Sequence, residues 1–150
     1  MRPEDLTRWL STERARVEEL AFLVRKQLAV PPPGSRARWL PEARECFRRL
    51  ADHLKKHMAL EETDGYLREV RERRPALSDE VDRLQHEHAE LERLMGHIQH
   101  EMDELRPEDN LLIRCCCARI GMLLSYVERH EEQENQLVLH VFCQDLGGDN

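Results

Sequence analysis

Residues 113–141 read IRCCCARIGMLLSYVERHEEQENQLVLHV, and this stretch decides the fold. Its apolar side chains recur along one helix face, which runs through Ile113, Ile120, Leu123, Val127, Leu137 and Val141. This spacing predicts a long helix with one buried face. Between Val127 and Leu137 the same face carries His130 and Glu134, so a polar pair interrupts an otherwise apolar stripe.

Three further segments carry the same helical pattern, and proline and glycine separate them. The sequence predicts helices over about 3–30, 41–71, 78–106 and 108–143, with breaks at Pro31–Gly34, Pro75, Pro107 and Gly147–Gly148. Four amphipathic helices joined by short loops predict an all-α, up-down-up-down four-helix bundle. Since no linker or repeat stands out, we expect residues 1–150 to form a single domain.

The composition agrees with this fold and excludes other classes of protein. The 150 residues include 22 leucines but only 14 valines, isoleucines and threonines, which excludes an all-β fold. A net charge of −7 argues against nucleic acid as a partner. The N-terminus lacks a signal-peptide pattern, and no stretch approaches the ~18 apolar residues of a spanning helix, so we expect a cytoplasmic protein without a membrane partner. The five cysteines are expected to be reduced thiols.

Each predicted helix has its apolar face interrupted near the middle by polar side chains. The interrupting residues are Arg14, His57, Glu61, His88, His130 and Glu134. Because the chain direction reverses at each loop, all six are expected at a similar height, in one layer of the bundle. Burying such groups without partners costs several kcal/mol each, so the layer needs a metal ion or a fully satisfied hydrogen-bond network.

Two pairs with i,i+4 spacing favour a metal ion over a purely structural network. A lone core histidine is usually a hydrogen-bonded structural residue. His57 with Glu61, and likewise His130 with Glu134, instead aim an imidazole and a carboxylate at one point. His88 faces both pairs from the third helix, so five residues are candidate metal ligands.

The other histidines are placed outside this set. One polar face of the third helix, which we expect to be solvated, carries His86, Glu90, Arg93, His97 and His100. His53 lies one turn before His57 and is expected at most at the edge of the site.

Three motifs together resemble the hemerythrin-like (HHE cation-binding) family, and the resemblance covers nearly the whole chain. The motifs are HMALEE from His57, EHAELERLM from Glu87 and HEEQEN from His130. Members of this family are four-helix bundles that hold a non-haem diiron centre. The resemblance implies that Glu61 and Glu134 are the bridging carboxylates. It also implies that His57 serves one metal, while His88 and His130 serve the other.

The first predicted helix departs from the family pattern because it contains no histidine. Arg14 stands on its stripe, with apolar neighbours at the three offsets at which His88 has leucines. Arg14 therefore takes the place expected for the missing histidine ligand. A guanidinium does not bind a cation. Glu13 lies about 100° around the helix from Arg14 and is a weak substitute.

Two outcomes for the site stay open. In the first, one metal ion remains, held by His88, His130, Glu61 and Glu134, while Arg14 fills the vacated half. Two histidines and carboxylates suit non-haem iron, and zinc or manganese fits the same ligand types. In the second, Arg14 replaces the metal charge and the bundle is metal-free.

The leading functional interpretation is an iron-binding protein of hemerythrin type with an incomplete diiron site, which binds or senses O2, NO or peroxide, or handles iron. The alternative is a metal-free helical interaction or regulatory protein. A third interpretation is thiol redox sensing through Cys115, Cys116 and Cys117, of which Cys116 is expected to face the core. The sequence defines no substrate pocket, so no enzymatic reaction is assigned.

Overall fold

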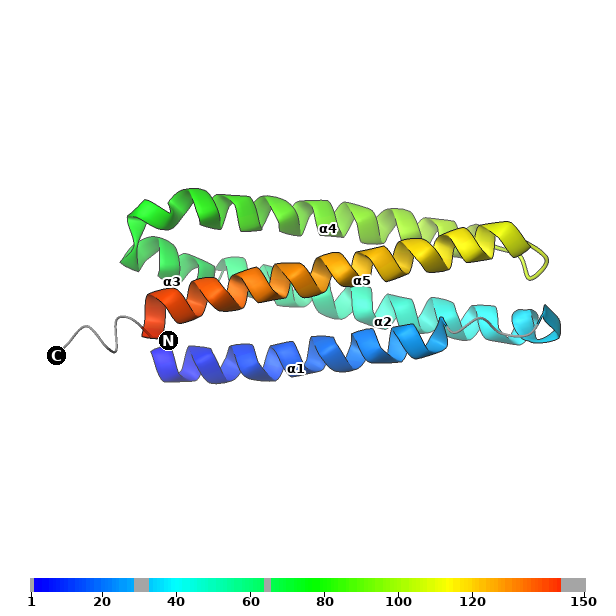
Figure 1. The fold of residues 1–150 in the computed structure, drawn as a ribbon, viewed down its shortest axis with the longest axis horizontal. Helices are drawn as coiled ribbons and strands as arrows, with labels where there is room; N and C mark the ends of the chain where they lie inside the picture. Colours follow the sequence, from blue (N-terminus) through cyan, green and yellow to red (C-terminus); the bar gives the residue numbers. More distant parts are fainter. Residues whose placement is uncertain (1, 29–32, 64–65, 144–150) are drawn as a thin grey trace.

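The computed structural model describes residues 2–28, 33–63 and 66–143, and this part of the chain contains helices and no strand. Its α-helices are α1 Pro3–Gln27, α2 Arg36–Thr63, α3 Tyr66–Arg73, α4 Ser78–Glu104 and α5 Asn110–Val138 (Figure 1). Short 3-10 turns, Pro33–Ser35 and Pro75–Leu77, precede α2 and α4, and a π-helical turn, Leu139–Cys143, follows α5. The predicted all-α fold is confirmed.

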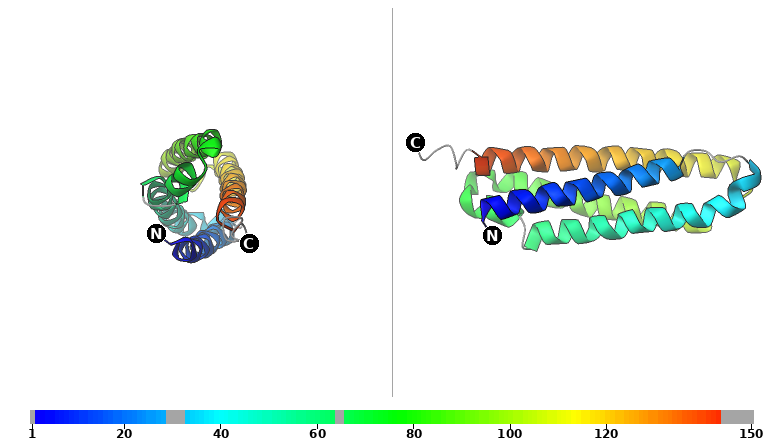
Figure 2. Two further views of the ribbon diagram at one scale, coloured as in Figure 1. Left: turned by 90° about the vertical axis from the view of Figure 1, so that its left-hand side faces the viewer. Right: turned by 90° about the horizontal axis from the view of Figure 1, so that it is seen from below.

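The four long helices form an up-down-up-down bundle. α1 packs against α2, α2 against α4, α4 against α5, and α5 against α1. The left-hand view of Figure 2, along the bundle, shows these helices around a common interior. The short helix α3 lies between α2 and α4 in the chain, contacts both and sits at one end of the bundle (Figure 1). Consequently α1 and α4 run in one direction, whereas α2 and α5 run in the other.

The second helix starts earlier than predicted. We expected it to begin near Pro41, but α2 begins at Arg36 and Pro41 lies inside it. The missing N–H of a proline removes one intrahelical hydrogen bond, yet its fixed φ angle suits a helix. Near the start of a helix of 28 residues, that loss is small compared with the packing of the whole helix.

The second helix also ends earlier than predicted. We expected it to continue to about Arg71, but α2 ends at Thr63 and the segment that follows forms the separate helix α3. Asp64 and Gly65, which lie between the two helices, both have low helix propensity. The predicted helical residues 29 and 30 lie outside the described part of the chain.

The apolar core is divided into two clusters by the polar layer. The larger cluster contains Leu50, Leu54 and Leu123 and fills the bundle toward the α1–α2 and α4–α5 connections. The smaller cluster contains Tyr66 and Leu84 and lies toward α3. The interrupting side chains are thus enclosed by apolar packing on both sides along the bundle. Polar atoms in such a layer are cut off from water and need partners.

One helix is long and apolar enough to cross a membrane by length and composition alone. It covers Asn110–Phe142, with a mean hydropathy of 1.4 in its most apolar window. The prediction that no stretch approaches a spanning helix was therefore too strong. A core helix of a bundle passes the same test, and the second half of this helix carries Glu128, Arg129 and Glu131 among other charges. This helix is weak evidence for a membrane.

Candidate metal centre

The structure brings the five predicted ligand residues together in the interior of the bundle, where all are buried. They form two overlapping groups, in each of which one possible ligand atom per residue lies within 4.8 Å of the others. We name the first the two-imidazole group, which consists of Glu61, His88, His130 and Glu134. We name the second the one-imidazole group, which consists of His57, Glu61, Glu131 and Glu134. Glu61 and Glu134 belong to both groups, whereas Glu131 was not predicted.

In both groups the imidazole Nε2 atoms point at the shared carboxylates. His88 Nε2 lies 2.9 Å from Glu134 Oε1 and 3.3 Å from Glu61 Oε2. His57 Nε2 contacts Glu61 Oε1, and His130 Nε2 contacts Glu134 Oε1. These two contacts are the i,i+4 pairs that the sequence predicted, and in both of them the donor atoms converge.

The opposite nitrogen of each imidazole contacts a carboxylate from the preceding long helix. Glu13 of α1 lies 3.1 Å from Nδ1 of His57 on α2. Glu62 of α2 lies 2.9 Å from Nδ1 of His88 on α4. Glu87 of α4 lies 3.0 Å from Nδ1 of His130 on α5. A carboxylate at Nδ1 fixes the ring orientation and leaves Nε2 free for a metal, which is the usual outer-shell arrangement of metal-binding histidines.

The first helix contributes Glu13, and not Arg14, to the interior. The Arg14 side chain is 36% exposed, and its guanidinium pairs with Glu132 at 3.0 Å and with Glu18 at 3.3 Å. The prediction that Arg14 lies in the buried layer is therefore wrong. Because its long side chain reaches carboxylates outside the core, the charge stays near solvent. Glu13, which we expected to be a weak substitute, contacts His57 and His53.

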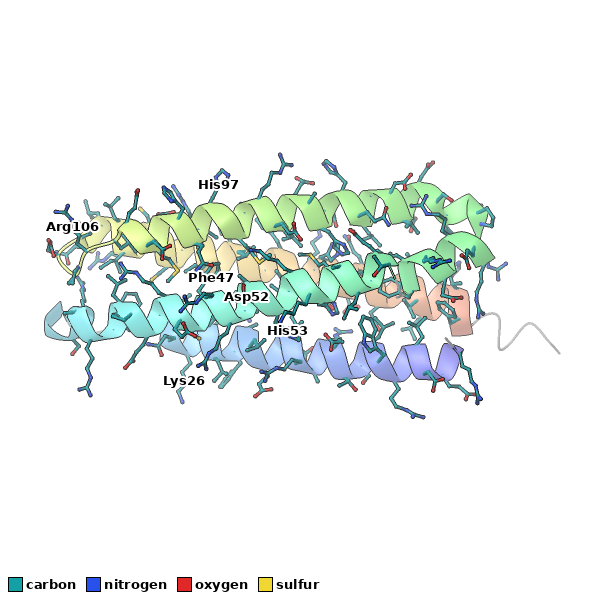
Figure 3. The ribbon with its side chains drawn as sticks, turned by 180° about the vertical axis from the view of Figure 1, so that it is seen from behind. Lys26, Phe47, Asp52, His53, His97 and Arg106 are labelled. Carbon is teal, nitrogen blue, oxygen red and sulfur yellow. The ribbon has the colours of Figure 1, made fainter. Side chains whose placement is uncertain are left out.

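The residues that the sequence analysis placed outside the site also lie outside it in the structure. His86, Glu90, Arg93, His97 and His100 are all exposed on α4, as predicted, and Figure 3 shows His97 pointing away from the bundle. His53 lies between α2 and α1, half-buried, with Nε2 3.3 Å from Glu13. Its ring also stacks on the His57 ring, with 6.4 Å between the centroids, so His53 lies at the edge of the centre.

Two more residues that the sequence analysis missed shape the centre. Tyr66 of α3 is fully buried and donates a hydrogen bond from its hydroxyl to Glu61 Oε2 at 3.1 Å. Trp9 stacks on the His57 ring at 5.8 Å between centroids. Trp9 stands one helical turn before Glu13. An alternative stripe through Leu6, Trp9 and Glu13 was therefore the available signal for Trp9 and Glu13.

The electrostatics of the centre without metal favour protonated imidazoles. Burial alone would lower the pKa of His57, but the adjacent carboxylates of Glu131 and Glu61 outweigh it and raise the pKa to about 11. Burial likewise opposes charge on His88, yet Glu134 and Glu61 raise its pKa to about 10. Burial and the charge of Glu134 raise the pKa of Glu61 to about 7.

The arrangement of these nitrogen and oxygen atoms suits the ligation of a metal ion better than hydrogen bonding among themselves. His57 Nε2, Glu61 Oε1 and His130 Nε2 are buried and make no well-aligned hydrogen bond within the described part of the chain. Glu61 belongs to both groups, whereas His57 belongs to the one-imidazole group and His130 to the two-imidazole group. A cation in either group would satisfy the buried atoms of that group, since imidazole nitrogens and carboxylate oxygens are metal-ligand types.

The cysteines on α5 form no comparable site. Cys115 is exposed, Cys116 is buried and Cys117 is partly buried, so the prediction that Cys116 faces the core is confirmed. Burial raises the pKa of the Cys116 thiol to about 12, and it also raises the pKa of Cys117. Both are thus held as thiols, which are poor nucleophiles. Cys46 is a free cysteine as well.

A four-helix bundle whose interior holds converging imidazoles and carboxylates defines a metal-binding helical protein. The model of the hemerythrin HHE cation binding domain matches residues 5–142, and the chain belongs to this family. No curated protein and no solved structure shows a significant match. Cation binding is the property for which the family is named, and the two groups supply candidate ligands for it.

The raised histidine pKa values predict that metal binding is coupled to proton release. A metal ion needs neutral imidazoles, so a divalent ion must displace protons from His57 and His88 at neutral pH, and affinity should rise with pH. The stability of the metal-free protein is expected to fall as pH rises. The stabilising effect of these protonated imidazoles is complete below about 6.5 and is lost as pH rises toward 10 and 11.

Calorimetric titration in two buffers of different ionisation enthalpy, together with melting temperatures of both forms from pH 6 to 9, checks this prediction. The difference in melting temperature between the metal-bound and metal-free forms should widen as pH rises. The prediction would be contradicted if the binding enthalpy were the same in both buffers and the affinity for the metal did not change with pH.

Proposed function

We propose that the protein binds non-haem iron at the two-imidazole group and uses it to bind or sense a small molecule such as O2, NO or peroxide. The observation that carries the proposal is that the four residues of this group bring possible ligand atoms within 4.8 Å of one another, while the buried His130 Nε2 and Glu61 Oε1 atoms make no well-aligned hydrogen bond within the described residues. Two imidazoles and two carboxylates that leave room for water suit non-haem iron. Iron held in this way would supply a position at which a small ligand binds. Handling of iron is a second use of the same site.

A groove that opens to solvent beside the two-imidazole group supports the binding of a small ligand. A groove of about 530 Å³ between α4 and α5 is lined by Glu87, Tyr126, Arg129 and His130, together with other residues of these helices. The groove therefore reaches the two-imidazole group at His130. Glu87 holds the His130 ring at Nδ1, and Tyr66 holds Glu61 by a hydrogen bond, so both ligand side chains are oriented before an ion arrives.

Other parts of the proposal rest on sequence and composition. The family match over residues 5–142 supports treating 1–150 as a single hemerythrin-like domain. The acidic net charge of −7 supports a protein without nucleic acid partners. The free cysteines among the described residues support a reducing, cytoplasmic location.

Anaerobic loading with Fe(II), followed by desalting and elemental analysis, tests the proposal. We expect about one iron per chain to be retained, and an absorption change when NO is added, because the open position is accessible. Zinc loading in parallel measures selectivity. If no metal is retained after reconstitution, the proposal is wrong and the alternative, a metal-free helical interaction or regulatory protein, is favoured.

A further inference from the structure

The first half of α5 leaves an apolar face uncovered on the outside of the bundle. Leu111 is 74% exposed, Met122 is 55% exposed and Tyr126 is 48% exposed, and Cys115 and Ala118 are exposed as well. The most apolar 18-residue stretch of this helix is only 33% buried, although a bundle helix normally buries its apolar side chains. Single exposed apolar residues are common, whereas a contiguous apolar face indicates a surface that contacts another molecule.

These residues have the spacing that two packed helices use. We name them the α5 stripe, which consists of Leu111, Cys115, Ala118, Met122 and Tyr126. The first four are separated by four, three and four residues, and this alternation keeps them on one side of a helix, as in the seam of a coiled coil. The core residues of α5 lie on its opposite side. The α5 stripe is therefore a second helix-packing face, and no helix of the described chain covers it.

Charged side chains border the α5 stripe on both sides. Arg114 lies on one side and is exposed. Arg119 lies on the other side, where its guanidinium pairs with Glu101 of α4 at 2.7 Å. An apolar strip between charged residues is the usual anatomy of a protein–protein interface. A membrane fits this surface less well, because an anionic lipid surface repels a chain with a net charge of −7.

We propose that the α5 stripe binds the α5 stripe of a second copy of this chain, in antiparallel orientation, with Ala118 at the crossing point. A symmetric interface is self-complementary, so each contact occurs twice. With the twofold axis beside Ala118, Cys115 of one copy lies opposite Met122 of the other. In the same register, Leu111 lies opposite Tyr126. The small side chain of Ala118 lets the two helices approach closely, while the larger residues pack on either side of it.

Charges at the ends of the α5 stripe select the antiparallel orientation. The same register brings Arg129 of one copy to Glu108 of the other, which stands just before α5. Both residues are exposed, and neither side chain has an ion-pair partner within the described part of the chain. A parallel pairing would instead place the two Arg129 side chains against each other, and like charges in an interface repel.

The size of the α5 stripe predicts a reversible dimer. From Leu111 to Tyr126 a helix rises by about 22 Å, and a helix is roughly 10 Å wide. A face of these dimensions is smaller than the roughly 800 Å² that each partner buries in a stable complex. The dimer is therefore expected to form and dissociate with protein concentration.

The oligomeric state of the full chain tests the inference. Sedimentation velocity is measured over a range of protein concentrations, with a reductant present so that no disulfide through Cys115 contributes. We expect a monomer–dimer equilibrium for wild-type protein. Ala118→Glu should raise the dimer dissociation constant by at least about tenfold, because it buries unpaired charge at the crossing point. The measurement needs no metal, so its result is independent of the proposed function.

Phe22→Glu is the matched control, since Phe22 is an exposed apolar residue of α1 outside the α5 stripe. It introduces the same charge and should leave the dimer dissociation constant unchanged. Both substituted positions are exposed, so both variants should keep the helical circular dichroism spectrum of wild-type protein. Equal loss of dimer in the two variants, or wild-type protein that stays monomeric at every concentration, would overturn the inference.

An exchange of charges tests the antiparallel register. Arg129→Glu and Glu108→Arg should each weaken the dimer several-fold, since each places like charges opposite one another. The double variant has opposite charges again and should recover most of the wild-type affinity. A double variant that dimerises no better than the single variants would overturn the inference.

Flotation with phosphatidylcholine vesicles examines the membrane as the other occupant of the α5 stripe. We expect wild-type protein to stay in the aqueous fraction, because its apolar face is covered by the second copy. Monomeric wild-type protein that floats with the vesicles, together with an Ala118→Glu variant that does not, would assign the α5 stripe to lipid and contradict the dimer.

Discussion

Glu134→Ala is expected to abolish the binding of every metal ion, because Glu134 is the carboxylate of both groups that also contacts His88 and His130. His130→Ala should remove the iron of the two-imidazole group. For both variants the loss should exceed the roughly 10–100-fold effect of an outer-shell substitution. His97→Ala is the matched control, since His97 is exposed on α4 and points away from the bundle. Metal content after desalting is the measurement.

Loss of folding must be separated from loss of ligation in this experiment. Removing one partner of a buried charged pair costs about 3–5 kcal/mol, so Glu134→Ala is expected to lower the melting temperature of the metal-free protein. Glu134→Gln keeps the shape and much of the hydrogen bonding, and circular dichroism reports whether the helices remain. A folded Glu134→Gln variant that retains all of its metal, or equal losses in the His97→Ala control, would show that the ligands lie elsewhere.

The fold and the three histidines could be predicted because each depends on spacing within a single helix. His130 and Glu134 interrupt an apolar stripe at a fixed four-residue interval, and a helix allows only one face for both. Their burial then follows from the burial of the stripe. The break after Thr63 was missed because Asp64 and Gly65 lie between apolar residues that fit one continuous helical pattern.

In the first helix, residue spacing alone does not determine which side chain points into the interior. Glu13 and Arg14 are adjacent, and both lie within the wide face that a bundle helix buries. Side-chain length decides between them. Arginine is long enough to carry its charge to Glu18 and Glu132 outside the core, whereas the shorter Glu13 stays beside His57. That outcome depends on carboxylates of α1 and α5 that no pattern within one helix reveals.

Glu131 was missed for a related reason. It follows His130 directly, so it points about 100° away around α5, and a one-sided helix would leave it exposed. α5 packs against α4 on one side and α1 on the other, so neighbouring positions face different parts of the same interior. Glu62 and Glu87 also adjoin a stripe residue. An acidic residue beside a core histidine or glutamate was thus the available signal for these outer carboxylates.

The register of α1 leads to the last prediction, Arg14→His. α1 and α4 run in the same direction, and Glu13 contacts Nδ1 of His57 as Glu87 contacts Nδ1 of His130. Residue 14 therefore corresponds to His88. An imidazole at this position is too short to follow Arg14 to Glu132, and the register of His88 directs it toward the one-imidazole group.

Arg14→His is expected to raise iron capacity from about one to about two ions per chain, since the one-imidazole group then gains a second nitrogen donor and a nearby fixed positive charge is removed. Arg16→His is the matched control, because Arg16 is exposed and pairs only with Glu19 among the interactions described for it. Iron-to-protein ratios after identical anaerobic loading of the three proteins give the measurement. If Arg14→His retained no more iron than Arg16→His, residue 14 would not face the group, and the correspondence between α1 and α4 would fail at the one position where it predicts a ligand.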